Sequence, residues 1–199
     1  MKDKIANSFE KMKTNEAKEY LGENFSERAF SNHVFSACVF ERCMFQDSDF
    51  QKSLFSECTF RSCNLHLVKM DGCRFQDVLF EECKIVGGEF FKCERRFFSP
   101  HFRSSLLMGC NFSDLKMQRT SFFGCKVHEC HFNNTSLVQA DFREADLKGS
   151  LFHHVDLSKA DFRRATNYSI DLSANTLTNG HFSLPECLSL LSSFDIQIS

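Results

Sequence analysis

The chain has 199 residues, 11 of them cysteine and 25 of them phenylalanine, and a formal charge of −2. This near-neutral charge argues against strong non-specific binding to nucleic acid, which usually needs a basic surface. No apolar run reads as a signal peptide or approaches the roughly 18 residues that suggest a membrane span. We therefore expect a cytoplasmic protein of one ordinary domain, with reduced thiols rather than a disulfide framework.

Residues 1–22 are expected to form an N-terminal cap or tail. Ile5, Phe9 and Met12 recur at helical spacing among many charged residues. This spacing is typical of a short amphipathic helix that could cover the end of the structure that follows. An unstructured charged tail is the alternative.

From residue 25 to residue 90, a large apolar side chain occupies every fifth position. These residues are phenylalanine except for Leu65, Met70 and Ile85. A helix turns by about 100° per residue and would smear such a series around its surface. A straight strand would send successive members to opposite faces. A chain that bends at every fifth residue points all of them to one axis, and four bends close a square coil of about 20 residues.

A second series of small residues supports the coil. Two positions before most of the large residues stands a compact one, such as Cys38, Cys58 or Ala140. The interior of a square coil is narrow, so each large side chain needs a small neighbour. We therefore interpret the cysteines as interior filler. They lack the C-x₂-C spacing of zinc sites, and we expect no metal and no cofactor.

The segments "ADFRE" (140–144) and "ADLKG" (145–149) are close to the A-(D/N)-L-x-x consensus of the pentapeptide repeat family. The resemblance covers residues 23–166, which is about seven coils of some 20 residues each. It implies an all-β fold, namely a right-handed quadrilateral β-helix. The expected domain order is therefore a cap or tail over 1–22, the β-helix over 23–166 and a C-terminal module over 167–199.

The period of five breaks once. After Phe90, the series of large residues is expected to resume at Phe97, because position 95 holds an arginine. Two extra residues should make one coil bulge, and the aromatics that follow core positions should point outward. Exposed apolar groups beside basic residues often mark partner sites. An insertion whose aromatics fold back over the corner is the alternative. The predicted partner-binding bulge consists of Phe91, Glu94, Arg95, Arg96 and Phe98.

A run of aspartates near the end of the repeat is a candidate acidic surface. It consists of Asp141, Asp146, Asp156 and Asp161. Basic residues stand close to this run in the sequence, and charges summed over five-residue units give no uniformly acidic face. The run is therefore only a candidate for imitating the dense negative charge of duplex DNA.

The C-terminal module, residues 167–199, carries helix signals. Ser183 is followed three residues later by Glu186, which is a capping box, and Pro185 stands in the first turn of the predicted helix. The apolar content is large for a simple cap, so this module could pair with its copy around a two-fold axis. The predicted dimerisation residues are Leu184, Leu188, Leu191, Phe194 and Ile196.

The segments "ATNYSIDLSANTL" (165–177) and "HFSLPECLSLLSSFDIQI" (181–198) resemble the C-terminal module of albicidin-resistance members of the family, and more distantly that of the microcin- and quinolone-resistance members. This resemblance implies a homodimeric, DNA-mimicking rod that binds DNA gyrase, a type II topoisomerase, and confers tolerance to quinolone- or albicidin-type poisons. It implies no direct contact with nucleic acid or membrane.

No catalytic motif is apparent, and a filled rod lacks the concave pocket of most enzymes. We therefore expect no enzyme. A structural or scaffold rod with an unrelated partner is the alternative.

Overall fold

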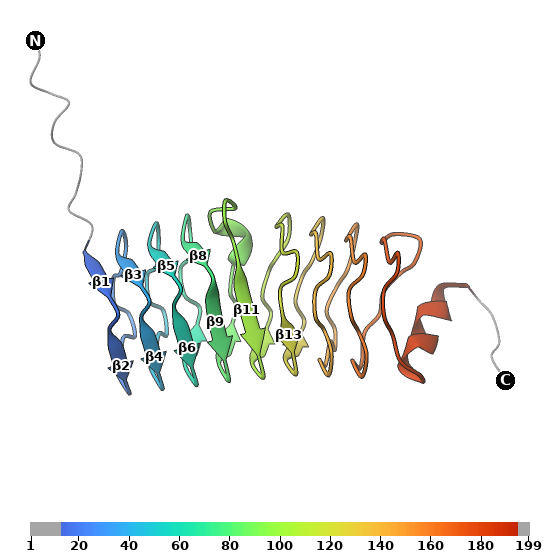
Figure 1. Cartoon of the computed structure of the whole chain (residues 1–199), viewed down its shortest axis with the longest axis horizontal. Coiled ribbons are helices and arrows are strands. Elements are labelled where there is room, and N and C mark those ends of the chain that lie inside the picture. Colours follow the sequence, from blue (N-terminus) through green and yellow to red (C-terminus); the bar gives the residue numbers. More distant parts are fainter. Residues whose placement is uncertain (1–12, 195–199) are drawn as a thin grey trace, which may run out of the picture.

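A computed structural model describes residues 13–194, with side chains described to residue 191. These residues wind into a right-handed quadrilateral β-helix, a rod with one short strand or bend on each face of each turn (Figure 1). The predicted fold is thus confirmed. No helix in this part of the chain has the length and apolar character needed to cross a bilayer.

Parallel ladders run along all four faces of the rod. The first face carries β1 (Thr14–Glu16), β3 (Val34–Ser36), β5 (Leu54–Ser56) and β8 (Arg74–Gln76). The second carries β2 (Glu19–Leu21), β4 (Val39–Glu41), β6 (Thr59–Arg61), β9 (Val78–Glu81), β11 (Pro100–Arg103) and β13 (Phe122–Phe123). The third carries β7 (Asn64–His66), β10 (Lys84–Val86), β12 (Leu106–Met108) and β14 (Lys126–His128). The fourth is built from isolated bridges such as Ala29 to Asp49.

The register of the ladders follows the sequence period. Phe40 pairs with Phe60, 20 residues further on, but Phe80 pairs with Phe102, 22 residues further on. The two additional residues of the sequence break therefore stay within one turn. Beyond that turn the ladder returns to a spacing of 20, as in the pair Phe102 and Phe122.

Columns of stacked aromatic rings run along the interior of the rod, and one of them extends from its first turn to its last. Adjacent rings in this column are nearly parallel, and their centroids lie 4.7 to 5.4 Å apart. This spacing matches the distance between hydrogen-bonded strands, so the rings stack because the backbone ladder sets their separation. The column consists of Tyr20, Phe40, Phe60, Phe80, Phe102, Phe122, Phe142, Phe162 and Phe182.

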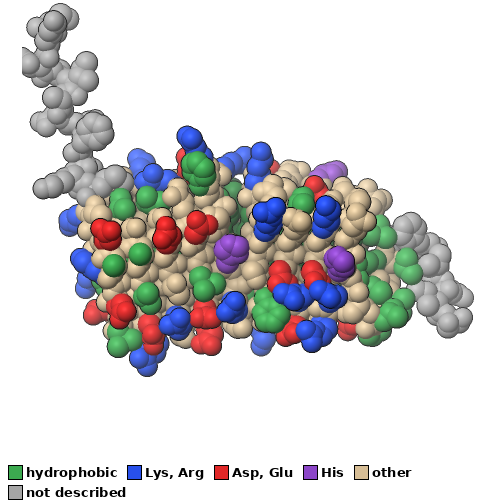
Figure 2. All heavy atoms as spheres, viewed as in Figure 1, with side chains coloured by type: hydrophobic (Ala, Val, Ile, Leu, Met, Phe, Trp, Pro, Cys, Tyr) green, Lys and Arg blue, Asp and Glu red, His purple; other side chains and the backbone are tan. Residues whose placement is uncertain are grey.

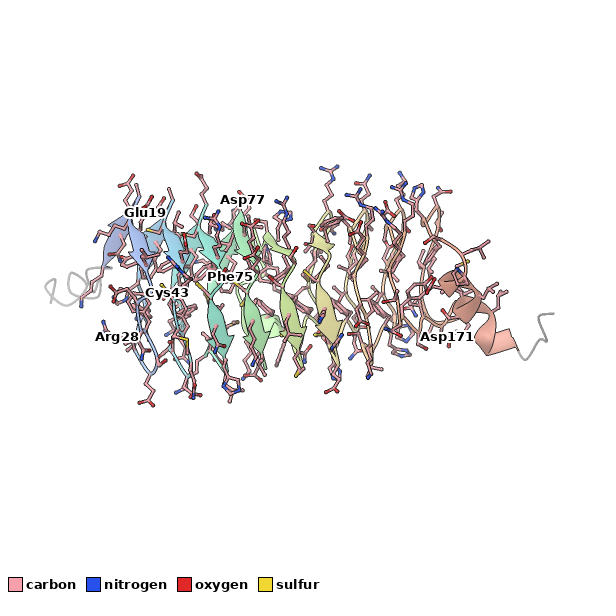
Figure 3. All side chains as sticks on the ribbon, turned by 90° about the horizontal axis from the view of Figure 1, so that it is seen from below. Glu19, Arg28, Cys43, Phe75, Asp77 and Asp171 are labelled. Carbon is pink, nitrogen blue, oxygen red and sulfur yellow. The ribbon has the colours of Figure 1, made fainter. Side chains whose placement is uncertain are left out.

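Each corner of the regular coil is formed by the residue that stands two positions after an inward-pointing side chain. Phe75 lies inside the rod, while Asp77 lies at its edge with φ of 51° (Figure 3). Many non-glycine corner residues share this left-handed backbone conformation, including Ala37 and Arg42. Such a conformation has a steric cost for L-residues, which the ladder on both sides of the corner offsets.

The solenoid is longer than the predicted residues 23–166. β1 and β2 pair with β3 and β4 at one end, and His181 bridges to Asp161 at the other. The ladder is made by backbone groups, so it continues where the side-chain pattern has faded. The 3₁₀ helix η2 (Glu186–Phe194) then follows. Ile5, Phe9, Met12 and Ile196 lie outside the described residues.

Candidate protein-binding surface

The bulge loop, residues 93–99, has seven residues where the other repeat units have five. It follows the 3₁₀ helix η1 (Phe90–Lys92) and precedes β11. The N–H of Glu94 donates to the carbonyl oxygen of Cys73 at 2.8 Å, and that of Ser99 donates to Phe75 at 2.9 Å. Both ends of the loop are thereby held to the preceding turn. The chain between them rises beyond the outline of the neighbouring turns (Figure 1).

Phe97 and Phe98 point in the opposite directions from those predicted. Phe98 is 6% exposed, and its ring lies 6.3 Å from that of Phe90, whereas Phe97 is 67% exposed. Phe97 adopts the left-handed conformation of a corner, with φ of 60°. Its side chain therefore faces outward, as at the corner residue Asp77. Phe98 thus belongs to the core, and Phe97 replaces it in the exposed part of the bulge.

Phe91, the other aromatic of the predicted bulge, lies on a different face. Its N–H donates to Asn111, which belongs to the fourth face, at 3.1 Å. The side chain is half-buried, and the ammonium of Lys92 lies 5.8 Å from its ring centroid. The structure therefore brings Glu94, Arg95 and Arg96 together on the first face, but not with Phe91.

A cluster of basic side chains surrounds the bulge loop on the first face, and we call it the basic patch. Arg96 stacks over the Phe97 ring at 5.0 Å, and Arg95 lies 3.8 Å from Asp114. Arg74, Glu94, Arg96 and Phe97, together with Gln76, line a shallow hollow. The basic patch consists of Arg74, Arg95, Arg96, Lys116 and Arg119.

Sequence reasoning missed Arg74, Lys116 and Arg119 as members of this surface. A signal was available, because Lys116 and Arg119 belong to the unit that lies four units after the bulge loop. Four units complete one turn, so both units share the first face. Arg74 precedes the loop by one turn in the same way.

On the second face of the rod, basic side chains form ion pairs with acidic ones, so the described part of this face has no basic patch. The guanidinium of Arg61 contacts Glu81 at 3.1 Å, and that of Arg143 contacts Asp141 at 2.8 Å. Acidic and basic side chains alternate over the visible surface and do not separate by sign (Figure 2). Burial opposes the ionisation of Asp161, but hydrogen bonds from Arg163 hold its pKa below the ordinary value. These ion pairs are partly exposed and contribute little each.

The four aspartates of the predicted acidic surface do not share a face. Asp141 and Asp161 bridge each other on the second face, whereas Asp146 bridges to Lys126 on the third. Asp156 lies on the first face, where it bridges to Ser136. The predicted single surface is therefore not assembled, because successive five-residue units turn onto different faces.

Each of these aspartates accepts the backbone N–H two residues further on. The distances are 3.1 Å for Asp141, 3.3 Å for Asp146, 3.0 Å for Asp156 and 3.0 Å for Asp161. Asn111 makes the same bond to Ser113 at 2.9 Å. Such side-chain turns stabilise a bend locally. The aspartates therefore have a structural task that an asparagine can also perform.

The C-terminal module presents apolar side chains around helix η2. Leu184 is 75% exposed and Leu188 is 40% exposed, whereas Leu190 is buried against the core. Leu191 is half-buried, and the side chain of Phe194 lies outside the described set. The hydroxyl of Ser183 does not cap the helix as predicted, since it accepts the N–H of Arg164 at 2.7 Å.

The cysteines line the interior and give no reactive site. Ten of the eleven are buried, and Cys187 is half-buried. The Cys58 thiol donates to the carbonyl oxygen of Phe35 at 3.4 Å. Burial raises the pKa of Cys58 and of Cys125 to about 12. Across residues 13–194, no three His, Cys, Asp or Glu side chains are placed to hold a metal ion.

Comparison with known proteins gives one family and several similar folds. A family model described as "Pentapeptide repeat region" matches residues 33–96 and 95–172. No curated protein sequence matches the chain. Two trypsin-treated variants of QnrB1, a plasmid-mediated fluoroquinolone resistance protein, are similar in structure. The first has a TM-score of 0.64 and 14% identity over 94% of this chain and 92% of that one. The second has a TM-score of 0.58 and 17% identity over 94% and 99%.

HetL, a pentapeptide repeat protein involved in heterocyst differentiation regulation in the cyanobacterium Nostoc, also has a similar fold. Its TM-score is 0.51, with 13% identity over 85% of this chain and 84% of HetL. At these identities the similarity concerns the fold alone. The finer resemblance to albicidin-resistance members stays a prediction.

Proposed function

We propose that this chain, which belongs to the pentapeptide repeat family, is a non-enzymatic cytoplasmic rod that binds DNA gyrase and confers tolerance to gyrase poisons. The structural similarity to QnrB1, a fluoroquinolone resistance protein, supports this choice of partner through the shared fold. The observation that carries the proposal is the bulge loop. It is a local departure from the regular coil that places an exposed aromatic among basic side chains, which is typical of partner sites.

The filled interior supports a binding protein over an enzyme. Catalysis usually requires a concave pocket in which polar groups converge. Here the aromatic column and the buried cysteines occupy the axis of the rod. The outer surface of the rod is therefore the part of the molecule that is available to bind a partner.

Recognition is proposed to run through the bulge loop more than through imitation of DNA charge. A DNA mimic needs a continuous acidic stripe. The aspartates near the C-terminal end are distributed over three faces, and two of them are paired with Arg143 and Arg163. The rod form still suits an elongated groove such as the DNA-binding saddle of gyrase, and the bulge loop would fix its position there.

Homodimerisation through the C-terminal module is part of the proposal. The exposed leucines Leu184 and Leu188 support it, because exposed apolar groups at the end of a solenoid favour association. The predicted interface also includes Leu191, Phe194 and Ile196. Light scattering should give the mass of a dimer for the wild type and that of a monomer for the double variant Leu184→Glu, Leu188→Glu.

A scaffold rod with an unrelated partner is the second candidate. The mixed charge of the second face favours it, since one coil can serve many partners. HetL shows that a similar fold occurs in a protein of another described role.

The test is gyrase supercoiling in the presence of a fluoroquinolone or albicidin, with purified protein added over a wide concentration range. We expect supercoiling to recover. An absence of rescue at every concentration would remove the gyrase proposal, and capture of a different partner by the tagged rod would favour the scaffold. The variant without Arg95 and Arg96 is the matched control for the bulge loop.

A further inference from the structure

We infer that the basic patch and Phe97 form a docking site for an acidic segment of a protein partner, with an apolar side chain of that segment seated against the Phe97 ring. This inference deepens the proposed function, on which it rests in taking the rod to be a binding protein. It adds the chemistry of the surface that the partner must present.

Three of the four arginines of the patch lack a carboxylate partner, and Arg95, which lies 3.8 Å from Asp114, is the exception. Of the 11 arginines in the sequence, seven have a carboxylate oxygen within 4.0 Å. Among the described residues, the four without one are Arg28, Arg74, Arg96 and Arg119, and three of these belong to the patch. A guanidinium without a carboxylate partner keeps donors for a carboxylate from outside, although Arg119 gives its Nε–H to the side-chain oxygen of Gln139 at 3.0 Å.

Lys116 adds a fourth unpaired charge to the same face. It lies one turn beyond the bulge loop and makes no ion pair with any described residue. Glu94 and Asp114 lie beside the patch but leave these four charges unpaired. Glu94 accepts the backbone N–H of Arg96 at 3.3 Å, and Asp114 lies 3.8 Å from Arg95 alone.

Phe97 supplies an apolar anchor at the centre of the charges. It is 67% exposed, and the Arg96 guanidinium covers one face of its ring at 5.0 Å. Aromatic and arginine side chains are enriched where protein interfaces are strongest. An arginine that is stacked on a ring also holds its donors in a fixed plane, which favours a bidentate contact with a carboxylate.

The partner segment is protein rather than nucleic acid, because the patch is short and bounded by acids. It spans three turns, or about 10 Å at the spacing of β-strands. Glu57 occupies a corner of the same face one turn before Arg74, Asp77 occupies the corner of Arg74's own turn, and Asp156 follows on the C-terminal side. A duplex carries phosphates without interruption and would meet these carboxylates. A short acidic segment fits between them.

The decisive experiment compares two double charge reversals in binding to purified gyrase. Arg96→Glu with Lys116→Glu changes the patch, and Lys148→Glu with Lys159→Glu makes the same change of charge at exposed positions outside it. We expect at least a tenfold loss of affinity for the patch variant and a change within about twofold for the control. Phe97→Ala should cost about tenfold. All of these residues are exposed, so the melting temperatures should stay near that of the wild type.

Three outcomes would overturn the inference. The first is an equal loss of affinity in the two double variants. The second is undiminished binding by Phe97→Ala. The third is binding of a fluorescent 20-base-pair duplex, about two helical turns, that the patch reversal abolishes, because the occupant would then be nucleic acid.

Failure of the proposed function would look different. If the wild type does not bind gyrase at all, the gyrase proposal is lost while the docking chemistry can still be measured. The probe is then poly-L-glutamate. Its retention by the wild type and the control, and its loss in the patch variant, would support the inference. Equal retention by all three would contradict it.

Discussion

Phe97 and Phe98 are adjacent in the chain, yet they lie on opposite sides of the wall of the rod. Phe98 reaches the ring of Phe90 in the core, while Phe97 is exposed beneath the guanidinium of Arg96. The corner conformation of Phe97 decides this arrangement. The stability of the bulge loop and its surface chemistry therefore depend on different residues, which mutation can separate.

Replacing each phenylalanine by alanine should have unequal effects on stability. Phe98→Ala removes a buried ring and leaves a cavity, so we expect a loss of about 3 kcal/mol. Phe97→Ala should change the free energy of unfolding by no more than about 0.5 kcal/mol, because its side chain is exposed. Urea unfolding of both variants measures the difference. Equal costs would show that Phe98 is not part of the core.

Deleting Arg95 and Arg96 should exchange the two phenylalanines. The loop would then read Cys93, Glu94, Phe97, Phe98, Ser99, which restores the five-residue unit and places Phe97 at the inward position. In this shortened chain, Phe97→Ala should cost about 3 kcal/mol and Phe98→Ala much less. If Phe98→Ala remains the costly change, the loop does not return to the regular coil.

The aspartates of the repeat should be replaceable by asparagine. Asp156 accepts the N–H of Ser158 and makes no ion pair with any described residue. Asp156→Ala should lose about 1 kcal/mol because this N–H loses its acceptor. Asp156→Asn should stay within about 0.5 kcal/mol of the wild type, since the amide oxygen can accept the same bond. Gyrase protection should persist in Asp156→Asn. Its loss there would assign the negative charge a functional role.

The native protein should react with thiol reagents at a single position. Cys187 is half-buried, whereas the other ten cysteines are buried and out of reach of the reagent. Iodoacetamide acts on the thiolate, so mass spectrometry should find one adduct before unfolding. The variant Cys187→Ser should give none. Several adducts on the folded protein would mean that the turns open far more readily than their packing indicates.

The stability of the rod should fall as the pH rises above about 9. Burial raises the pKa of Cys58 and Cys125 from 9.0 to about 12. Between these values the thiols ionise in the unfolded chain but stay protonated in the folded one, so the unfolded state binds fewer protons and is favoured. The stabilisation is complete below about pH 9 and is lost as the pH approaches about 12. Melting temperatures at pH 8 and pH 10 test this, and a double variant Cys58→Ala, Cys125→Ala should show a shallower fall.

The sequence alone was sufficient to predict the coil and its interior. A large residue at every fifth position, with a small one two places before it, is compatible with few backbones other than a four-cornered coil. The pattern repeats over many turns, so it remains recognisable where another apolar residue replaces phenylalanine, as at Leu65 or Met70. The two ends of the solenoid could not be predicted in the same way, because the backbone ladder continues through Tyr20 and His181 where the side-chain pattern has faded.

The sequence alone could not predict which side chains are exposed and which charges are paired on the outer surface of the rod. Which of Phe97 and Phe98 turns inward depends on the corner that the loop backbone adopts and on the space beside Phe90. Which arginines are paired depends on residues one turn away, as when Arg61 meets Glu81, 20 positions further along the chain. Local bends and apolar periodicity are properties of neighbouring residues, and the sequence determines them directly. Surface charge pairing and loop direction arise only when successive turns are stacked, because stacking brings together side chains that are distant in sequence.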